Sequence, residues 1–127
     1  MFDSERAFKV KIVQLILGKE TQKAIEALSQ HYGIVVPQLR VGMPKKYGKK
    51  VGCYVSNTKT IHVVNREKLE DPFVILHEFY HHIRTHGGEH LGTEKHANRF
   101  AEEFIEAYKT FGKYSFNVSC KHENSAI

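Results

Sequence analysis

The spacing of hydrophobic residues predicts two helices at the start of the chain. Apolar side chains recur every three or four residues over 5–17 and again over 21–32, which is the period of a helix with one buried face. Gly18 and Gly33 follow these stretches, and glycine is favoured just beyond the end of a helix. The two stretches form either two helices or one bent helix.

The pattern then changes to short runs of β-branched residues, which predict strands. The predicted strands cover residues 34–36, 39–41, 51–55 and 60–64. Pro37 ends the first run, and the second run continues it beyond the proline. The turn residues 56–59 between the last two runs indicate a β-hairpin.

A more hydrophobic helix is predicted to begin after Asp71. Asp is favoured as an N-cap and Pro72 suits the first helical position, while Gly87-Gly88 provides a stop. The residues after Pro72 are apolar on most sides of the helix, which indicates that this helix is buried.

This helix carries the segment His77-Glu78-Phe79-Tyr80-His81, which has the form HExxH. Residues four positions apart lie on one helix face, so His77 and His81 can bind one metal ion while Glu78 reaches the same place as a proton acceptor. The alternative interpretation is an amphipathic surface helix that carries two solvent-exposed histidines at this spacing by chance. However, ionisable groups in a buried helix are costly unless they are paired or metal-bound. The segment therefore predicts a zinc site.

Catalytic zinc usually has three protein ligands, so a third is expected on a following helix with Thr93 as its N-cap. On a helical wheel Glu94 lies closer to the apolar face of that helix than His96 does, and Asn98, one turn further on, would orient a ligand. His96 competes as third ligand because imidazole binds zinc well. Compensation of the helix dipole by Glu94, and a solvated surface position for His96, are the alternatives without metal.

The two motifs together resemble the gluzincin metallopeptidases, in which HExxH is followed on a second helix by ExxAD or ExxAN, as in residues 94–98 here. The resemblance covers about residues 31–108. It is to the small soluble minigluzincins, which are related to the catalytic domains of HtpX and of CAAX-prenyl endopeptidases. It implies a minimal zincin fold in which an edge strand, 51–55 or 39–41, borders the cleft and pairs with an extended peptide. Most gluzincins use a glutamate as third ligand, which corresponds to Glu94, whereas the minimal soluble members use a histidine, which favours His96. The resemblance therefore leaves both residues as candidates.

The activity expected from these residues is hydrolysis of peptide bonds with one Zn²⁺ as cofactor. The metal, held by His77, His81 and either Glu94 or His96, would activate a water. Glu78 would take the proton of that water as general base and pass it to the leaving amine. Candidate donors to the developing oxyanion are Tyr80, His82, His86 and Tyr108.

A separate C-terminal tail is predicted after the catalytic domain, which covers residues 1–111. Residues 112–127 show no helical period, which is typical of a disordered end. The alternative is an inhibitory segment that brings Cys120 or His122 to the zinc. Minigluzincins keep themselves inactive through C-terminal segments, so the resemblance favours latency.

The composition of the chain limits the number of domains, the cellular location and the kinds of partner that are expected. The chain has 127 residues, net charge +5 and 41% hydrophobic residues, which predicts one globular domain. It has no apolar run of about 20 residues and no signal-peptide core, and Cys53 and Cys120 make no metal-type spacing, so a cytoplasmic location is expected. The lysines around Tyr47 are compatible with nucleic-acid binding. A solvated loop explains them equally, and no sequence pattern of a nucleic-acid-binding fold accompanies them.

The order of elements predicts an α+β fold, with helices on one face of a small mixed sheet. The expected function is a zinc endopeptidase that acts on a peptide or protein and is latent through its tail. The alternatives are a regulatory peptidase dedicated to one repressor and, less favoured, a basic nucleic-acid-binding protein with structural zinc. Oligomers formed by exchange of the tail or a helix are compatible with the sequence.

Overall fold

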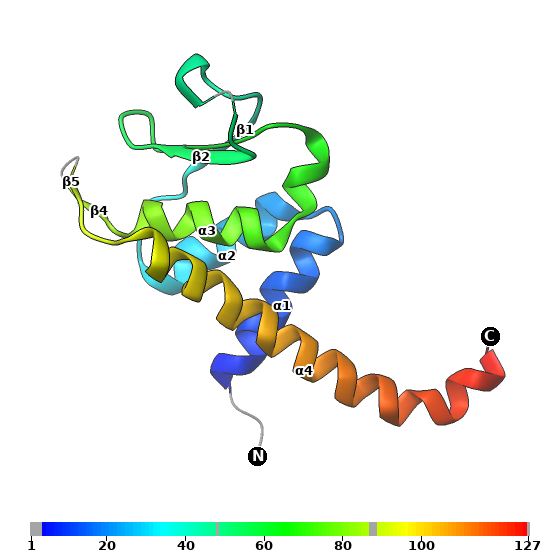
Figure 1. The fold of residues 1–127 in the computed structure, drawn as a ribbon. Coiled ribbons are helices and arrows are strands. Elements are labelled where there is room, and N and C mark those ends of the chain that lie inside the picture. The colour runs from blue at the N-terminus through cyan, green and yellow to red at the C-terminus, as the bar shows by residue number, and fades with distance from the viewer. Residues whose placement is uncertain (1–3, 48, 87–88, 127) are drawn as a thin grey trace.

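The computed structural model describes residues 4–47, 49–86 and 89–126, with side chains outside the description at 86, 89–90 and 112–126. These residues form an α+β fold of four α-helices and a small three-stranded mixed sheet (Figure 1). The α-helices are α1 (Ser4–Leu17), α2 (Thr21–Tyr32), α3 (Pro72–Ile83) and α4 (Glu94–Ala126). The strands are β1 (Gln38–Val41), β2 (Gly52–Val55), β3 (Thr60–Val63), β4 (Thr85–His86) and β5 (Glu89–His90). Two 3₁₀ helices are η1 (Lys45–Tyr47) and η2 (Arg66–Glu70).

The two N-terminal helices are separate, which settles the choice between two helices and one bent helix. Gly33 caps α2 in the left-handed conformation, with φ of 67°, and its N–H donates to the carbonyls of Ser29 and Gln30. Lys19, in the link between the helices, also has a positive φ of 67°. The predicted ends of both helices are confirmed to within one residue.

The sheet has the order β1-β3-β2, with β1 parallel and β2 antiparallel to β3. The predicted hairpin is therefore confirmed, and β1 and β2 form opposite edges. The prediction of a strand over residues 34–36 is wrong, because regular pairing begins only at Gln38. Pro37 has no N–H for a ladder, and the Val35 carbonyl accepts a hydrogen bond from Nε2 of His82 at 2.7 Å instead.

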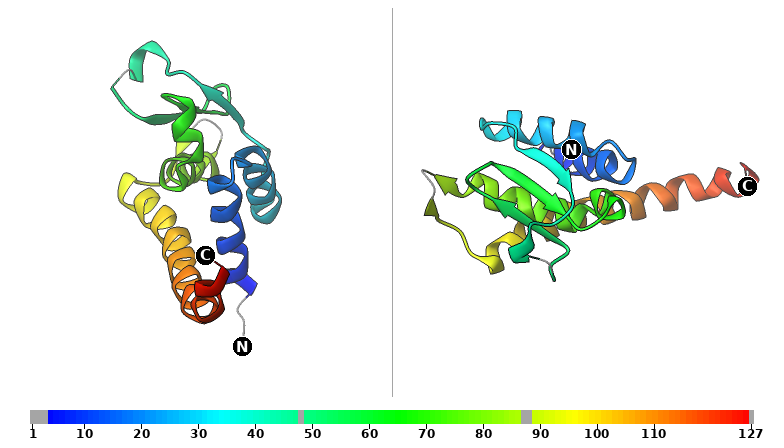
Figure 2. Two further views of the ribbon diagram at one scale, coloured as in Figure 1. Left: turned by 90° about the vertical axis from the view of Figure 1, so that its right-hand side faces the viewer. Right: turned by 90° about the horizontal axis from the view of Figure 1, so that it is seen from above.

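Helix α3 lies at the centre of the fold. It contacts β2 and β3 on one side and α1 and α4 on others, and Figure 2 shows the sheet and these helices around it. Phe79 on α3 and Phe104 on α4 are the largest fully buried side chains of the core. Because α3 is packed on several sides, its position relative to β2 and α4 is fixed by core contacts.

The predicted start of α3 is confirmed. Oδ1 of Asp71 accepts hydrogen bonds from the backbone N–H groups of Phe73 at 3.0 Å and Val74 at 3.3 Å, and Pro72 takes the first helical position. The helix ends at Ile83, and the short β4–β5 hairpin that follows was not predicted. The expected stop at residues 87–88 lies outside the described residues.

Helix α4 begins as predicted but ends much later. Oγ1 of Thr93 accepts a hydrogen bond from the backbone N–H of His96 at 3.1 Å, which confirms the N-cap. The prediction of a non-helical segment after Gly112 is wrong, because the backbone stays helical to Ala126 and leads away from the other helices (Figure 1). One interior glycine costs a helix only about 1 kcal/mol.

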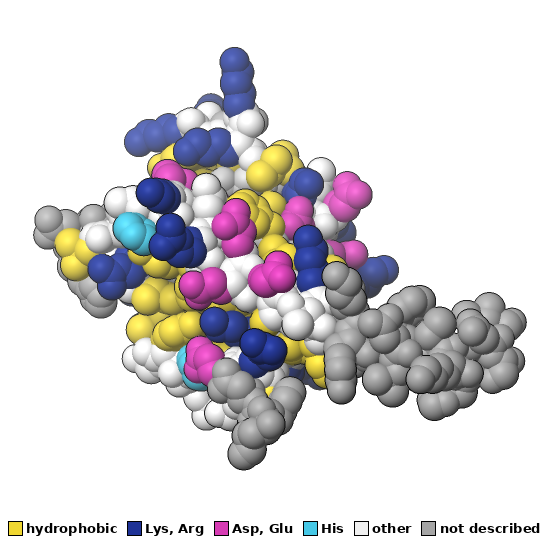
Figure 3. All heavy atoms as spheres, turned by 60° about the horizontal axis from the view of Figure 1, so that its bottom comes forward, with side chains coloured by type: hydrophobic (Ala, Val, Ile, Leu, Met, Phe, Trp, Pro, Cys, Tyr) yellow, Lys and Arg dark blue, Asp and Glu magenta, His cyan; other side chains and the backbone are white. Residues whose placement is uncertain are grey.

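The C-terminal segment carries the predicted inhibitory residues. The side chains of Cys120 and His122 lie outside the described residues, so inhibition by residues 112–127 stays a prediction. None of the described helices is both long and apolar enough to cross a lipid bilayer. On the face shown in Figure 3, acidic and basic side chains lie among one another at the centre, and several basic side chains gather at the upper edge.

Candidate metal centre

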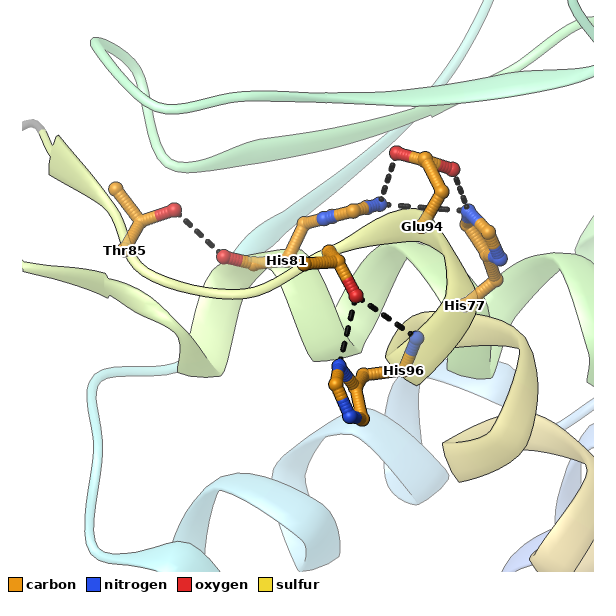
Figure 4. Close-up of polar contacts among 6 residues, drawn as sticks. His77, His81, Thr85, Glu94 and His96 are labelled. Atoms are coloured by element: carbon orange, nitrogen blue, oxygen red, sulfur yellow. Dashed lines mark hydrogen bonds and ion pairs between the residues drawn. The ribbon is translucent and has the colours of Figure 1, made fainter.

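Helices α3 and α4 bring together the side chains of His77, His81 and Glu94 (Figure 4). Nε2 of His77 lies 2.9 Å from Oε1 of Glu94, and Nε2 of His81 lies 3.0 Å from Oε2 of the same carboxylate. The two Nε2 atoms are 3.3 Å apart. Each of the three residues thus offers a possible ligand atom, and these three atoms lie within 4.8 Å of one another.

These separations fit a tetrahedral zinc site. Metal–ligand distances of about 2.0–2.1 Å place neighbouring donors of a tetrahedron roughly 3.3 Å apart. The Nε2 atoms of His77 and His81 are 3.3 Å apart, at that value, and one donor atom from each of the three residues lies within 4.8 Å of the others. Two imidazoles and one carboxylate are also a donor set that zinc accepts, with a fourth position left for water or substrate. The residues present thus fit the metal.

The surroundings of the three donors differ in exposure. The side chains of His77 and His81 are 15% and 12% exposed, whereas that of Glu94 is 74% exposed. Burial raises the pKa of Glu94, but the neighbouring His81 and the hydrogen bond from His77 outweigh it and hold this pKa below its usual value. Nδ1 of His77 is buried without a hydrogen-bond partner in the described part of the chain. The cluster is therefore open to solvent on the Glu94 side.

His96 does not join this cluster. Its Nδ1 lies 2.7 Å from Oγ1 of Thr93, its side chain is exposed, and Figure 4 shows its ring turned away from His77 and His81. Asn98 is also exposed and makes no side-chain hydrogen bond within the described residues. Of the two candidates for third ligand, the structure places Glu94 beside the histidines.

Glu78 lies beside the cluster in a protected position. Glu78 is 8% exposed. Burial raises the pKa of its carboxyl group to about 7, and the negative charge of Glu94 contributes to this rise. The positive charge of Lys50 acts in the opposite direction. A carboxylate with such a pKa can both accept and return a proton near neutral pH.

A cleft of about 660 Å³ opens over the cluster. Its walls come from β2 and the residues before it, from α3, and from the segment that leads into α4. Of the two strands predicted as candidates to border the cleft, β2 does so, whereas β1 forms the far edge of the sheet. The outer edge of β2 carries no paired strand among the described residues.

Two glycines allow the close approach of these walls. A Cβ on Gly52 would lie 2.8 Å from Cγ1 of Val74 and 3.5 Å from Cγ of Glu78, so β2 passes directly against α3. A Cβ on Gly92 would lie 2.6 Å from Cε2 of Tyr80. Neither glycine was singled out from the sequence. A glycine at the start of a β-rich run is the one signal that could have pointed to Gly52.

The predicted oxyanion donors have different positions. His82 is 7% exposed and links three segments, because Nε2 donates to the Val35 carbonyl and Nδ1 accepts from the hydroxyl of Tyr54 at 2.7 Å. The ring of Tyr80 packs against that of Phe100, with centroids 5.6 Å apart. Tyr108 packs against the hydrophobic core further along α4, and the side chain of His86 lies outside the described residues. His82 thus has a structural role that occupies both ring nitrogens.

Comparison with known proteins gives no relative. No protein-family model, no curated protein and no solved structure matches this chain significantly. The resemblance to gluzincins therefore stays a prediction, and the inference of function depends on the geometry of the cluster.

Proposed function

We propose that this protein is a zinc-dependent endopeptidase with a minimal zincin fold. The observation that carries the proposal is the meeting of His77, His81 and Glu94 at one point, with Glu78 next to it. A chance cluster of exposed acidic groups would not supply two half-buried imidazoles whose Nε2 atoms face each other at 3.3 Å. The pairing of such a cluster with a buried, proton-accepting carboxylate is the arrangement that metal-assisted hydrolysis needs.

Glu78 would move the proton. Zinc bound by the three ligands would act as a Lewis acid and lower the pKa of a water toward neutrality. The carboxylate of Glu78 accepts a proton from the attacking water and delivers it to the nitrogen of the cleaved peptide bond. Its burial suits this role, because a desolvated carboxylate takes up a proton more readily than an exposed one.

Strand β2 would hold the substrate. An extended peptide can add to the free edge of β2 through main-chain hydrogen bonds, which do not depend on sequence. Gly52 keeps this edge close to Glu78, with only 3.5 Å between a Cβ at Gly52 and Cγ of Glu78. A peptide paired with β2 therefore passes over the proposed metal and the general base.

The test is Glu78→Gln in the full chain. Zinc content, measured by elemental analysis, is expected to stay at one ion for each chain, because Glu78 is not a ligand. Casein cleavage by the zinc-loaded protein is expected to fall by about 10²–10⁴-fold, the usual contribution of a general base. His77→Ala serves as the comparison, since it is expected to lose both zinc and cleavage. Full cleavage by the Glu78→Gln protein would overturn the mechanism, and a wild-type protein that binds no zinc would overturn the proposal.

A further inference from the structure

Lys50 is the one Lys or Arg among the described residues that line the cleft. It stands two positions before β2, and its backbone N–H donates to the Tyr47 carbonyl at 3.0 Å. Its Nζ lies over the ring of Tyr47, 6.0 Å from the centroid, and Tyr47 also lines the cleft. The ammonium group is therefore held at the rim of the cleft.

A second feature of this ammonium group is that it forms no ion pair within the described residues. No ion pair joins Lys50 to a carboxylate in the described part of the chain, although other lysines such as Lys9, Lys23 and Lys68 form such pairs. Burial is the main influence on the pKa values of Glu78 and Glu94, but the charge of Lys50 acts on both and lowers them. The charge thus faces the cleft and is available to an anion that enters it.

We propose that Lys50 selects substrates that carry a carboxylate close to the cleaved bond, so that acidic peptides are the preferred class. This inference depends on the proposed function. The carboxylate is either the side chain of Asp or Glu or the free C-terminus of a short peptide. The chain has a formal net charge of +5 at pH 7, which adds a general attraction for acidic substrates to the specific contact.

For a peptide that pairs antiparallel with β2, this contact lies on the C-terminal side of the cleaved bond. Lys50 precedes Gly52 by two residues in the bend before β2, so their backbones are at most about 7 Å apart, and Gly52 lies beside Glu78. A peptide antiparallel to β2 has its later residues at the beginning of β2. The first or second residue after the cleaved bond therefore lies within reach of the lysine side chain.

A different role for Lys50 would be to tune the charge of the site. In that case its removal would change kcat for all peptides alike, whatever their charge. Selection of substrate instead changes KM, and only for acidic peptides. The two roles are separated by comparing octapeptides that are identical except for Asp, Asn or Lys after the cleaved bond, each with a free or an amidated C-terminus.

The experiment uses the full zinc-loaded chain and its variants Lys50→Met, Lys50→Arg and Lys46→Met. Lys46 lies in η1 outside the lining of the cleft and is the matched control. The wild-type protein is expected to favour the Asp peptide over the Asn peptide by about fivefold in kcat/KM, as for an exposed charge pair. Lys50→Met is expected to lose this preference through KM, whereas Lys50→Arg and Lys46→Met keep it. The preference should also weaken at high salt.

Binding decides the inference independently of cleavage. Fluorescence anisotropy with labelled Asp and Asn peptides and the Glu78→Gln protein should show the same preference, removed by Lys50→Met. A preference that survives Lys50→Met, or equal binding of the Asp and Asn peptides whether the C-terminus is free or amidated, would overturn the role of Lys50. If peptides bind with this preference but the wild-type protein cleaves none, the proposed function fails and the anion contact stands. Equal binding of the Asp and Asn peptides, weakened for both by amidation in the Lys50 protein but not in Lys50→Met, assigns the contact to the C-terminal carboxylate.

Discussion

Glu94 lies with Oε2 3.0 Å from Nε2 of His81, while its other oxygen lies 2.9 Å from Nε2 of His77. One carboxylate at the first position of α4 thus contacts two successive turns of α3. The α3–α4 packing that makes this contact is built from buried residues such as Phe79 and Ala97. The position of the Glu94 carboxylate therefore depends on the packing of α4 against α3.

The first prediction separates the two candidates for third ligand. Glu94→Ala is expected to weaken zinc binding by more than about tenfold, because it removes a donor that contacts both histidines. His96→Ala is the control, since His96 is turned away and exposed. Zinc affinity is measured by competition with a chromophoric chelator. A normal affinity in the Glu94→Ala protein with a weakened one in His96→Ala would reverse the assignment.

The second prediction concerns stability with metal. A ligand that binds only the folded protein stabilises it by about 2.7 kcal/mol at a hundredfold excess over its Kd. Zinc is therefore expected to raise the Tm by several degrees, and EDTA to reverse the rise. His77→Ala should show no rise, whereas His96→Ala should respond as the wild-type protein does. An equal rise in the His77→Ala protein would mean that zinc binds elsewhere.

The third prediction tests the close approach of β2 to α3. Gly52→Ala places a Cβ 2.8 Å from Cγ1 of Val74, and overpacking of this kind costs about 1–3 kcal/mol. The free energy of unfolding should fall, and kcat/KM should fall with it because the substrate edge moves away from Glu78.

A double-mutant cycle identifies the clash behind that loss. Val74→Ala removes the methyl group that the new Cβ would meet, so Gly52→Ala should cost less in the Val74→Ala background than in the wild-type protein. Urea unfolding of the four proteins gives the coupling. Additive losses would show that the strand shifts for another reason.

Much of this fold follows from local patterns. Capping explains why the starts of two helices were predicted correctly, since Asp71 and Thr93 each satisfy a backbone N–H at a helix start. The hairpin of β2 and β3 follows from two β-rich runs around a turn. The prediction of a strand at residues 34–36 was wrong because of a tertiary contact, since the Val35 carbonyl accepts a hydrogen bond from His82 and not from a neighbouring strand. Such a partner cannot be read from the sequence around it.

The candidate site was predictable to a similar degree. The spacing of His77 and His81 places both on one helix face, so their meeting is a local property. The choice of Glu94 over His96 was favoured by the helical wheel but depends on how α4 packs against α3. Lys50 and Gly52 were not found, because their importance comes from contacts with α3 and the cleft that form only in the folded chain.

The last prediction concerns the hydrogen bond that joins β2 to the C-terminal end of α3. The Tyr54 hydroxyl donates to Nδ1 of His82, and that histidine is buried with its other nitrogen already engaged by Val35. Tyr54→Phe leaves Nδ1 without a partner, and an unsatisfied buried acceptor costs about 1–3 kcal/mol. The urea concentration at the midpoint of unfolding should therefore be lower for Tyr54→Phe than for the wild-type protein. The control is Tyr47→Phe, which removes a hydroxyl from the segment before β2 and should change this midpoint little. If both variants unfold at the wild-type midpoint, the bond between Tyr54 and His82 does not hold the strand against the helix.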